Sequence, residues 1–193
     1  AHIPVISEVE LAYRFKGDSK IIAITGSNGK STVTSLIYHI CKTAGFDCAL
    51  VGNIGYSFAK QVALDPRPLY VVEVSSFQLD DIVTFRPDIA ILTNITEDHL
   101  DRYDGMDDYA AAKARLFERA AVQVVNREDA RVLAMTRRER PVVSFGTDRP
   151  KAPGDYGLER RGDAIELLRG TTPLLASDEL RIGGLHNCAN VLA

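Results

Sequence analysis

The chain has 193 residues, and 23 Lys and Arg against 26 Asp and Glu give it a formal net charge of −3. Hydrophobic residues make up 46% of it and charged residues 25%, which is typical of a soluble globular domain and excludes collagen-like, coiled-coil and disordered chains. The near-balanced charge argues against a basic nucleic-acid-binding face, so we expect no nucleic-acid partner. No apolar run approaches the ~20 residues that a membrane-spanning helix needs, and no secretory signal is visible, so we expect no membrane partner.

The chain has three cysteines, Cys41, Cys48 and Cys188. Their number is odd, and their spacing fits no zinc or redox motif. We therefore expect small, buried, reduced thiols, which predicts a cytoplasmic location.

The chain opens with a short strand-like piece and a helical turn within residues 3–15. Residues 21–25 are short, β-branched and apolar, which is typical of a strand buried on both faces. A glycine-rich turn follows at 26–29, and residues 30–44 have helical spacing. We expect the apolar face of that helix to consist of Leu36, Ile37, Ile40 and Cys41.

The alternation of strands and helices then repeats. Further strands are predicted at 48–51, 69–74, 89–93, 122–125 and 142–145. Further helices are predicted at 107–120 and 128–136. This order predicts an α/β fold with a mostly parallel central sheet flanked by helices, similar to a P-loop NTPase. Short strand-like pieces after residue 146 predict a small antiparallel annex near residues 154–182, and a helix starts near residue 185.

Residues 25–32 read TGSNGKST and lie between a predicted strand and a predicted helix. Glycines there let backbone N–H groups form an anion nest, at the positive end of the helix dipole. Lys30 would reach the outer phosphates of a nucleotide, and Ser31 or Thr32 would offer a hydroxyl to Mg²⁺. The alternative is a tight strand–helix turn with a solvated lysine, and phosphate binding is favoured over it.

Polar residues follow the other strands at the same predicted sheet edge, where open α/β sheets bind ligands. They are Asn53, Glu73, Ser75, Ser76, Asn94, Glu97, Asp98 and His99. A carboxylate at Glu73, inside a buried strand, is costly unless it binds a metal or pairs with a lysine. His99 is either a ligand or a loop histidine capped by a carboxylate. Tyr109 and Lys113 share one helix face, and on pattern alone they are a surface pair.

Six segments occur in an order that resembles the Mur ligases, the ATP-dependent amide-forming enzymes of peptidoglycan precursor synthesis. They are TGSNGKST (25–32), GNIG (52–55), VEVSSFQL (72–79), TNITEDHLDRY (93–103), YAAAK (109–113) and GLHNCAN (184–190). The run at 75–79 is most similar to the branch that adds D-glutamate. The resemblance implies that residues 1–17 are the tail end of an N-terminal UDP-binding domain and that 18–193 form the central ATP-binding domain. The C-terminal amino-acid-binding domain is expected to be absent from this chain.

The resemblance also implies site residues. ATP would be held by Gly26, Ser27, Asn28, Gly29, Lys30, Ser31, Thr32, Asn187 and Asn190. Two Mg²⁺ ions would be bound by Ser31, Glu73, His99 and Lys113, the last as a carbamate whose oxygens suit Mg²⁺ better than an ammonium does. The substrate would lie near Asn53, Ser75, Ser76 and Tyr109. The catalytic set would be Lys30, Asn53, Glu73, His99 and Lys113.

The implied reaction joins D-glutamate to UDP-N-acetylmuramoyl-L-alanine through an acyl phosphate, in a monomeric bacterial enzyme. Three alternative functions share part of this pattern. Another Mur-type or folylpolyglutamate-type ligase would share the scaffold. A P-loop GTPase is disfavoured because the chain lacks the Asp-x-x-Gly and Asn-Lys-x-Asp motifs. A catalytically silent nucleotide-binding module is supported only by the missing flanks.

Overall fold

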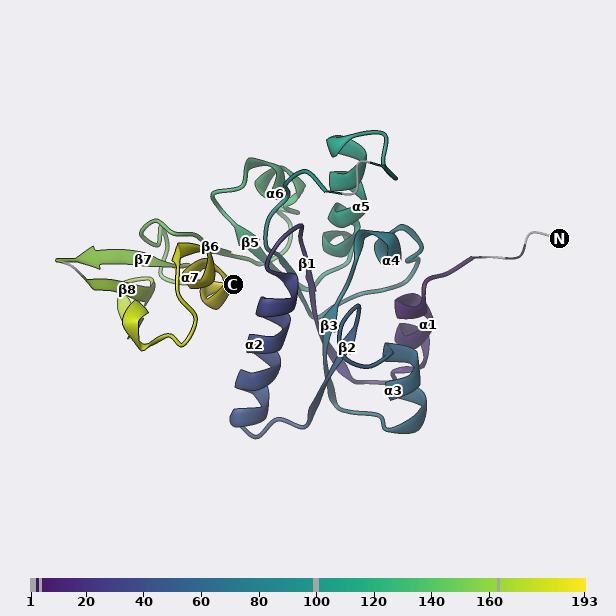
Figure 1. The fold of residues 1–193 in the computed structure, drawn as a ribbon. Coiled ribbons are helices and arrows are strands. Elements are labelled where there is room, and N and C mark those ends of the chain that lie inside the picture. Colours follow the sequence, from purple (N-terminus) through teal and green to yellow (C-terminus); the bar gives the residue numbers. More distant parts are fainter. Residues whose placement is uncertain (1–2, 4, 99–100, 163) are drawn as a thin grey trace.

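A computed structural model describes residues 3, 5–98, 101–162 and 164–193. Its centre is one sheet of nine strands in the order β2-β3-β1-β4-β5-β6-β7-β8-β9 (Figure 1). The strands are β1 (Lys20–Thr25), β2 (Cys48–Gly52), β3 (Leu69–Glu73), β4 (Ile89–Leu92), β5 (Val122–Asn126), β6 (Val142–Phe145), β7 (Tyr156–Arg161), β8 (Ala164–Arg169) and β9 (Thr172–Ala176). The helices are α1 (Glu8–Phe15), α2 (Lys30–Thr43), α3 (Phe58–Leu64), α4 (Ser76–Asp80), α5 (Met106–Glu118), α6 (Ala130–Met135) and α7 (Leu185–Leu192), and a 3₁₀ turn covers Ser177–Glu179.

Strands β1 to β6 pair in parallel, so their carboxyl ends share one edge. The predicted α/β fold is therefore confirmed. The predicted antiparallel annex is also found, in β7, β8 and β9. The annex continues the central sheet, and β7 joins β6 through a single parallel pair, Phe145 with Tyr156.

Helices cover both faces of the sheet (Figure 1). On one face, α1, α3, α4, α5 and α6 bury side chains with alternate strand residues such as Ile21, Ala23 and Val72. On the other face, Val33 of α2 packs with Ile24, Val71 and Ile91. The alternation explains why these strands read as almost continuous apolar runs, because both of their faces are covered.

The predicted apolar face of α2 is wrong in part. Ile40 is 59% exposed, whereas Val33 and Thr34 are the fully buried residues of the helix. Ile37 and Tyr38 pack against the Val33 cluster, so the stripe that faces the sheet is shifted by one position. The sequence pattern predicts only a helical turn where α1 is found and no element where α3 is found. These two helices contact each other on one face of the sheet.

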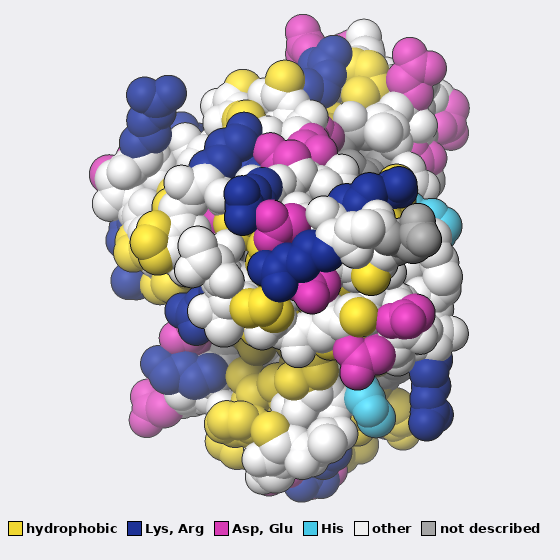
Figure 2. All heavy atoms as spheres, turned by 90° about the vertical axis from the view of Figure 1, so that its left-hand side faces the viewer, with side chains coloured by type: hydrophobic (Ala, Val, Ile, Leu, Met, Phe, Trp, Pro, Cys, Tyr) yellow, Lys and Arg dark blue, Asp and Glu magenta, His cyan; other side chains and the backbone are white. Residues whose placement is uncertain are grey.

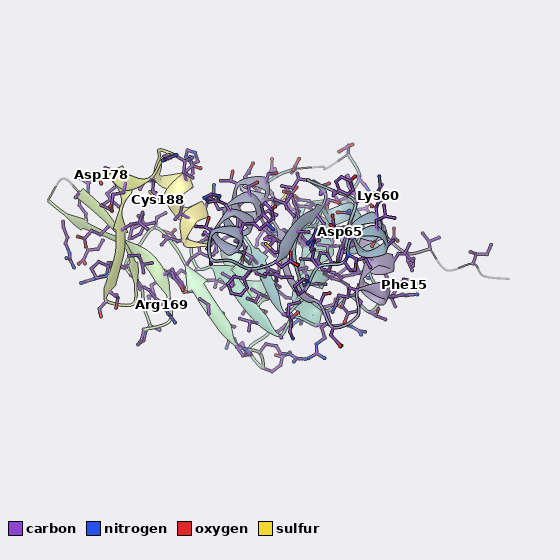
Figure 3. All side chains as sticks on the ribbon, turned by 90° about the horizontal axis from the view of Figure 1, so that it is seen from below. Phe15, Lys60, Asp65, Arg169, Asp178 and Cys188 are labelled. Carbon is purple, nitrogen blue, oxygen red and sulfur yellow. The ribbon has the colours of Figure 1, made fainter. Side chains whose placement is uncertain are left out.

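Helix α7 packs against the annex. Cys188 and Leu192 are buried with Phe145, Leu158 and Leu167. Viewed from below, Cys188 lies over the annex strands, and Phe15 lies at the opposite end of the molecule (Figure 3). The three cysteines are free thiols. Cys48 and Cys188 are buried, as expected, whereas Cys41 is only half-buried.

The annex end of the surface mixes both signs of charge. Lys and Arg side chains are interspersed there with Asp and Glu (Figure 2). Arg149 pairs with Glu159 at 2.7 Å, and Arg161 pairs with Glu166 at 3.2 Å. Positive and negative side chains therefore pair with one another on this face. Among the described residues, no helix is both long and apolar enough to cross a membrane.

Candidate nucleotide and metal site

Gly26 and Gly29 shape the loop between β1 and α2. Both have positive φ angles, +148° and +83°. A Cβ added to Gly26 would overlap Thr93 Oγ1, and one added to Gly29 would overlap Asn190 Oδ1. Backbone conformation therefore favours glycine at both positions, and at Gly26 the closeness of Thr93 also leaves no space for a Cβ. The first turn of α2 contains no acidic residue, so no negative side chain in that turn offsets the positive end of the helix dipole.

The segment after β4 is bonded closely to this glycine loop. The backbone N–H of Ser27 donates to the carbonyl of Asn94 at 2.9 Å. The backbone N–H of Asn28 donates to Asn94 Oδ1 at 2.9 Å, and Asn94 Nδ2 donates to the carbonyl of Asn28 at 2.9 Å. Thr93 Oγ1 donates to the same carbonyl at 2.7 Å. The role of Thr93 and Asn94 in the geometry of the loop was not predicted, although their position after a parallel strand is a signal for it.

Lys30 bridges the loop from the first turn of α2. Its Nζ donates to the carbonyl of Ser27 at 2.8 Å. Ser31, the next residue, is exposed, and Thr32 is half-buried. The ammonium and the hydroxyl predicted to meet phosphate and Mg²⁺ therefore lie at the same end of α2, beside the glycine loop.

Helix α5 supports the loop with Tyr109 and Lys113, which are 0% and 2% exposed. Tyr109 Oη lies 3.1 Å from Ser27 Oγ. Lys113 Nζ donates to the carbonyl of Gly26 at 2.9 Å and lies 4.8 Å from the centroid of the Tyr109 ring. The reading of these two residues as an exposed surface pair is therefore wrong, because α5 turns this face toward the loop.

Burial and, to a smaller extent, the nearby charge of Lys30 lower the pKa of Lys113 from 10.5 to about 7, although the charges of Asp98 and Glu73 act in the opposite direction. A buried ammonium is poorly solvated, so the neutral amine is favoured. Near neutral pH, the Lys113 side chain is therefore an uncharged, nucleophilic amine in a large fraction of the molecules.

Glu73 ends β3 and is 1% exposed. Its Oε1 accepts a hydrogen bond of 2.7 Å from Asn53 Nδ2, from the end of neighbouring β2. Within the described part of the chain, Glu73 Oε2 is buried without a hydrogen-bond partner and no lysine forms an ion pair with Glu73. A buried carboxylate oxygen without a donor is a group that a hard cation such as Mg²⁺ would satisfy.

Over the described ranges, no group of three or more His, Cys, Asp or Glu is arranged to hold a metal. His99, predicted as a ligand, lies outside those ranges. Mg²⁺ keeps several waters when it binds to a protein and commonly takes only one or two carboxylates from it. A set of few protein ligands, such as Glu73 and Ser31, is therefore compatible with Mg²⁺.

Ser75 and Ser76 begin α4. Ser75 Oγ accepts from the backbone N–H of Gln78, and Gln78 Oε1 accepts from the backbone N–H of Ser75, a reciprocal capping box. Ser76 is 2% exposed. Its hydroxyl forms a hydrogen bond with Tyr103, whose pKa rises to about 12, chiefly through burial and despite that bond.

Helix α7 brings Asn187 and Asn190 to the loop. Asn190 Nδ2 donates to Asn187 Oδ1 at 3.3 Å, and Asn190 lies against Gly29. Helices α2 and α7 also contact each other. A residue near the end of the sequence, Asn190, therefore contacts the glycine loop, which lies near the start of the sequence.

Residues 24–193 match the family described as Mur ligase middle domain. The chain belongs to this family. The resemblance expected from the sequence motifs is thereby confirmed.

Individual relatives agree with this assignment. The UDP-N-acetylmuramoylalanine--D-glutamate ligase of Nitrosomonas europaea is 44% identical over 206 residues, which cover 99% of this Mur ligase middle domain and 44% of the relative. The ligase of the same name from Methylobacillus flagellatus is 45% identical over 192 residues, covering 99% and 42%. The chain therefore spans less than half the length of these relatives.

Solved structures share the fold. A UDP-N-acetylmuramoyl-L-alanyl-D-glutamate--2,6-diaminopimelate ligase aligns with a TM-score of 0.75 at 24% identity, over 91% of this chain and 42% of that one. The UDP-N-acetylmuramate:L-alanyl-gamma-D-glutamyl-meso-diaminopimelate ligase of Neisseria meningitides aligns with a TM-score of 0.70 at 18% identity, over 96% and 62%. At these identities the likeness extends to the fold alone.

Proposed function

We propose that this chain is the ATP-binding part of a bacterial cytoplasmic ligase that joins D-glutamate to UDP-N-acetylmuramoyl-L-alanine. The observation that carries the proposal is the glycine loop with Lys30 on it and the buried, half-satisfied Glu73 at the next strand end. Support for the substrates comes from relatives at 44% and 45% identity that have this name. Residues 1–17 would then be the tail end of an N-terminal UDP-binding domain, and 18–193 the middle domain of a monomer.

In this proposal the substrate carboxylate attacks the γ-phosphorus of ATP and ADP leaves. The resulting acyl phosphate is attacked by the amino group of D-glutamate, which releases phosphate and forms the amide. Lys30 and the loop Gly26–Thr32 would bind the phosphates and stabilise the negative charge that develops on them during the in-line transfer. Asn53, Ser75, Ser76 and Tyr109 are the proposed substrate-side residues. Asn187 and Asn190 are proposed to lie beside the adenine.

Two Mg²⁺ ions would be bound by Glu73, Ser31, His99 and Lys113. When bound, they would neutralise the negative charge of the phosphates. The neutral amine of Lys113 would add to CO₂, forming an N–C bond and releasing one proton, which gives a carbamate. Burial favours this step, because the pKa of the amine is lowered to about 7.

The proposal is tested by titrating the chain with a fluorescent ATP analogue, with and without Mg²⁺. We expect binding that Mg²⁺ strengthens, and we expect Glu73→Gln to remove most of that strengthening. The matched control is Glu118→Gln, because Glu118 is exposed on α5. No binding by the folded wild-type chain, or equal Mg²⁺ dependence in Glu73→Gln, would contradict the proposal. In the intact parent enzyme, phosphate release should require D-glutamate.

A further inference from the structure

The side-chain amide of Asn94 pairs with the main chain of Asn28 as one peptide group pairs with another. Its oxygen accepts from the backbone N–H of Asn28, and its nitrogen donates to the carbonyl of Asn28, both at 2.9 Å. The hydroxyl of Thr93, which is 3% exposed, donates to the same carbonyl at 2.7 Å. Two donors thus hold one carbonyl oxygen of the glycine loop toward the segment after β4.

This pairing fixes the orientation of the Asn28–Gly29 peptide. In a trans peptide the carbonyl and the following N–H point in opposite directions. Since the Asn28 carbonyl is held toward Thr93 and Asn94, the N–H of Gly29 is turned away from them, into the loop. The φ of +83° at Gly29 then leads directly into the first turn of α2.

The same residue also occupies the two preceding donors. The backbone N–H of Ser27 donates to the carbonyl of Asn94, and that of Asn28 donates to Asn94 Oδ1. These two N–H groups are therefore already used within the protein, so the donors offered to an anion begin at Gly29.

We propose that Asn94, assisted by Thr93, is a positioning residue that presents the N–H of Gly29 to the nucleotide phosphates. The inference rests on the proposed nucleotide binding and assigns Asn94 no direct contact with the ligand. Holding the donor in place before binding avoids the free-energy cost of ordering it when the phosphate arrives.

The test compares two variants and one control with the wild type. Each is titrated with the Mg²⁺ complex of a fluorescent ATP analogue and with adenosine, which lacks phosphate. Asn94→Asp keeps an oxygen facing the Asn28 N–H but sets a second oxygen against the Asn28 carbonyl, and Thr93→Val removes the other donor. We expect Asn94→Asp to bind the ATP analogue about tenfold more weakly, and Thr93→Val to bind it severalfold more weakly. Adenosine affinity should be unchanged in both.

The matched control is Asn126→Ala. Asn126 Nδ2 donates to the carbonyl of Thr93 at 3.0 Å, so this variant loosens the same segment without touching the glycine loop. We expect its affinity for the ATP analogue to stay within about twofold of wild type. Equal losses in Asn126→Ala and Asn94→Asp, or equal losses of adenosine and ATP-analogue binding, would overturn the positioning role.

A measurement without nucleotide separates this inference from the proposed function. Hydrogen exchange at the Asn28 N–H should be slow in the wild type and at least about tenfold faster in Asn94→Ala. If that protection is lost as expected but the wild type binds no ATP analogue, the proposed function fails and the phosphate role fails with it. If the wild type binds normally and Asn94→Asp binds equally well, only the role of Asn94 is overturned.

Discussion

Asn190 on α7 lies against Gly29 in the glycine loop, so closely that a Cβ on Gly29 would overlap Asn190 Oδ1. The contact joins the end of the described chain to the loop that opens α2. It sets the shape of one wall of the proposed nucleotide site.

The Gly29–Asn190 contact predicts the effect of Gly29→Ala. Gly45 is a matched control, since its φ of +85° is almost that of Gly29, +83°, and an added Cβ there meets nothing within 4 Å. We expect Gly45→Ala to lower the free energy of unfolding by about 1 kcal/mol through backbone strain alone. Gly29→Ala should lose a similar amount of stability, because Asn190 Oδ1 is the mobile end of a side chain and can move aside. That displacement changes the wall of the site, so Gly29→Ala, unlike Gly45→Ala, should bind the ATP analogue about tenfold more weakly. Urea unfolding and titration measure the two effects, and identical behaviour of the variants would refute the contact.

Lys113 should be the site of carbamate formation. With ¹³C-labelled bicarbonate near pH 8, we expect one carbamate resonance from the wild-type chain and none from Lys113→Met, because the lowered pKa leaves the Lys113 amine neutral. Lys60→Met is the control, since Lys60 is exposed and lies far from the annex end (Figure 3). A resonance that persists in Lys113→Met would move the carbamate elsewhere.

Glu10 predicts a pH dependence of stability. Its carboxylate is 0% exposed and accepts hydrogen bonds from the backbone of Val83, Thr84 and Phe85. Burial alone would raise its pKa, but bonds from Thr84, Val83 and Arg14 outweigh burial and lower the pKa from 4.5 to about 2.

Because the folded-state pKa of Glu10 is the lower one, its stabilisation is present above pH 4.5 and is lost as the pH falls toward 2. We expect Glu10→Gln to lower the free energy of unfolding by about 2–3 kcal/mol at pH 7, and the gap to wild type to narrow below pH 4.5. Urea titrations at several pH values provide the measurement. A gap that stays constant from pH 7 to 3 would contradict the assignment.

Arg127 binds the start of the annex to the segment after β6. Its side chain is 6% exposed, pairs with Asp148 at 2.5 Å and donates to the carbonyl of Tyr156 at 2.6 Å. We expect Arg127→Met to lower the free energy of unfolding by about 1–2 kcal/mol. It removes a buried guanidinium that donates to the carbonyls of Tyr156 and Asp148, while the Asp148 carboxylate left behind is 39% exposed and can be solvated. Arg131→Met is the control, since Arg131 and Asp107 are 45% and 96% exposed. It should change stability by less than about 1 kcal/mol in the same urea titration.

The sequence predicted those parts of the fold whose signal is local. Apolar runs such as residues 21–25 gave the buried strands, and the glycine-rich turn before Lys30 gave the loop. The helical periodicity of residues 30–44 gave the helix but not its buried stripe, because Ile40 and Val33 are told apart only by where the sheet lies.

The site was predictable where a residue type alone limits the chemistry. A carboxylate at Glu73 inside an apolar strand indicated a special environment, and its buried, half-satisfied state agrees with that. The part played by Asn94 was not predictable in the same way. Its partners are the backbone atoms of a segment far away in sequence, and those are brought to it only when β4 pairs with β1.

The single residue pair between β6 and β7 has a mechanical consequence. A sheet resists bending through its ladder of backbone bonds, and at this boundary the ladder is reduced to Phe145 and Tyr156. Backbone pairing therefore contributes little to holding the annex at this boundary. The buried cluster of Phe145, Leu158 and Leu192 and the Arg127–Asp148 pair supply the remaining contacts. Because Leu192 of α7 belongs to this cluster, the position of Asn190 beside Gly29 depends on side-chain packing between the annex and the sheet rather than on a backbone ladder.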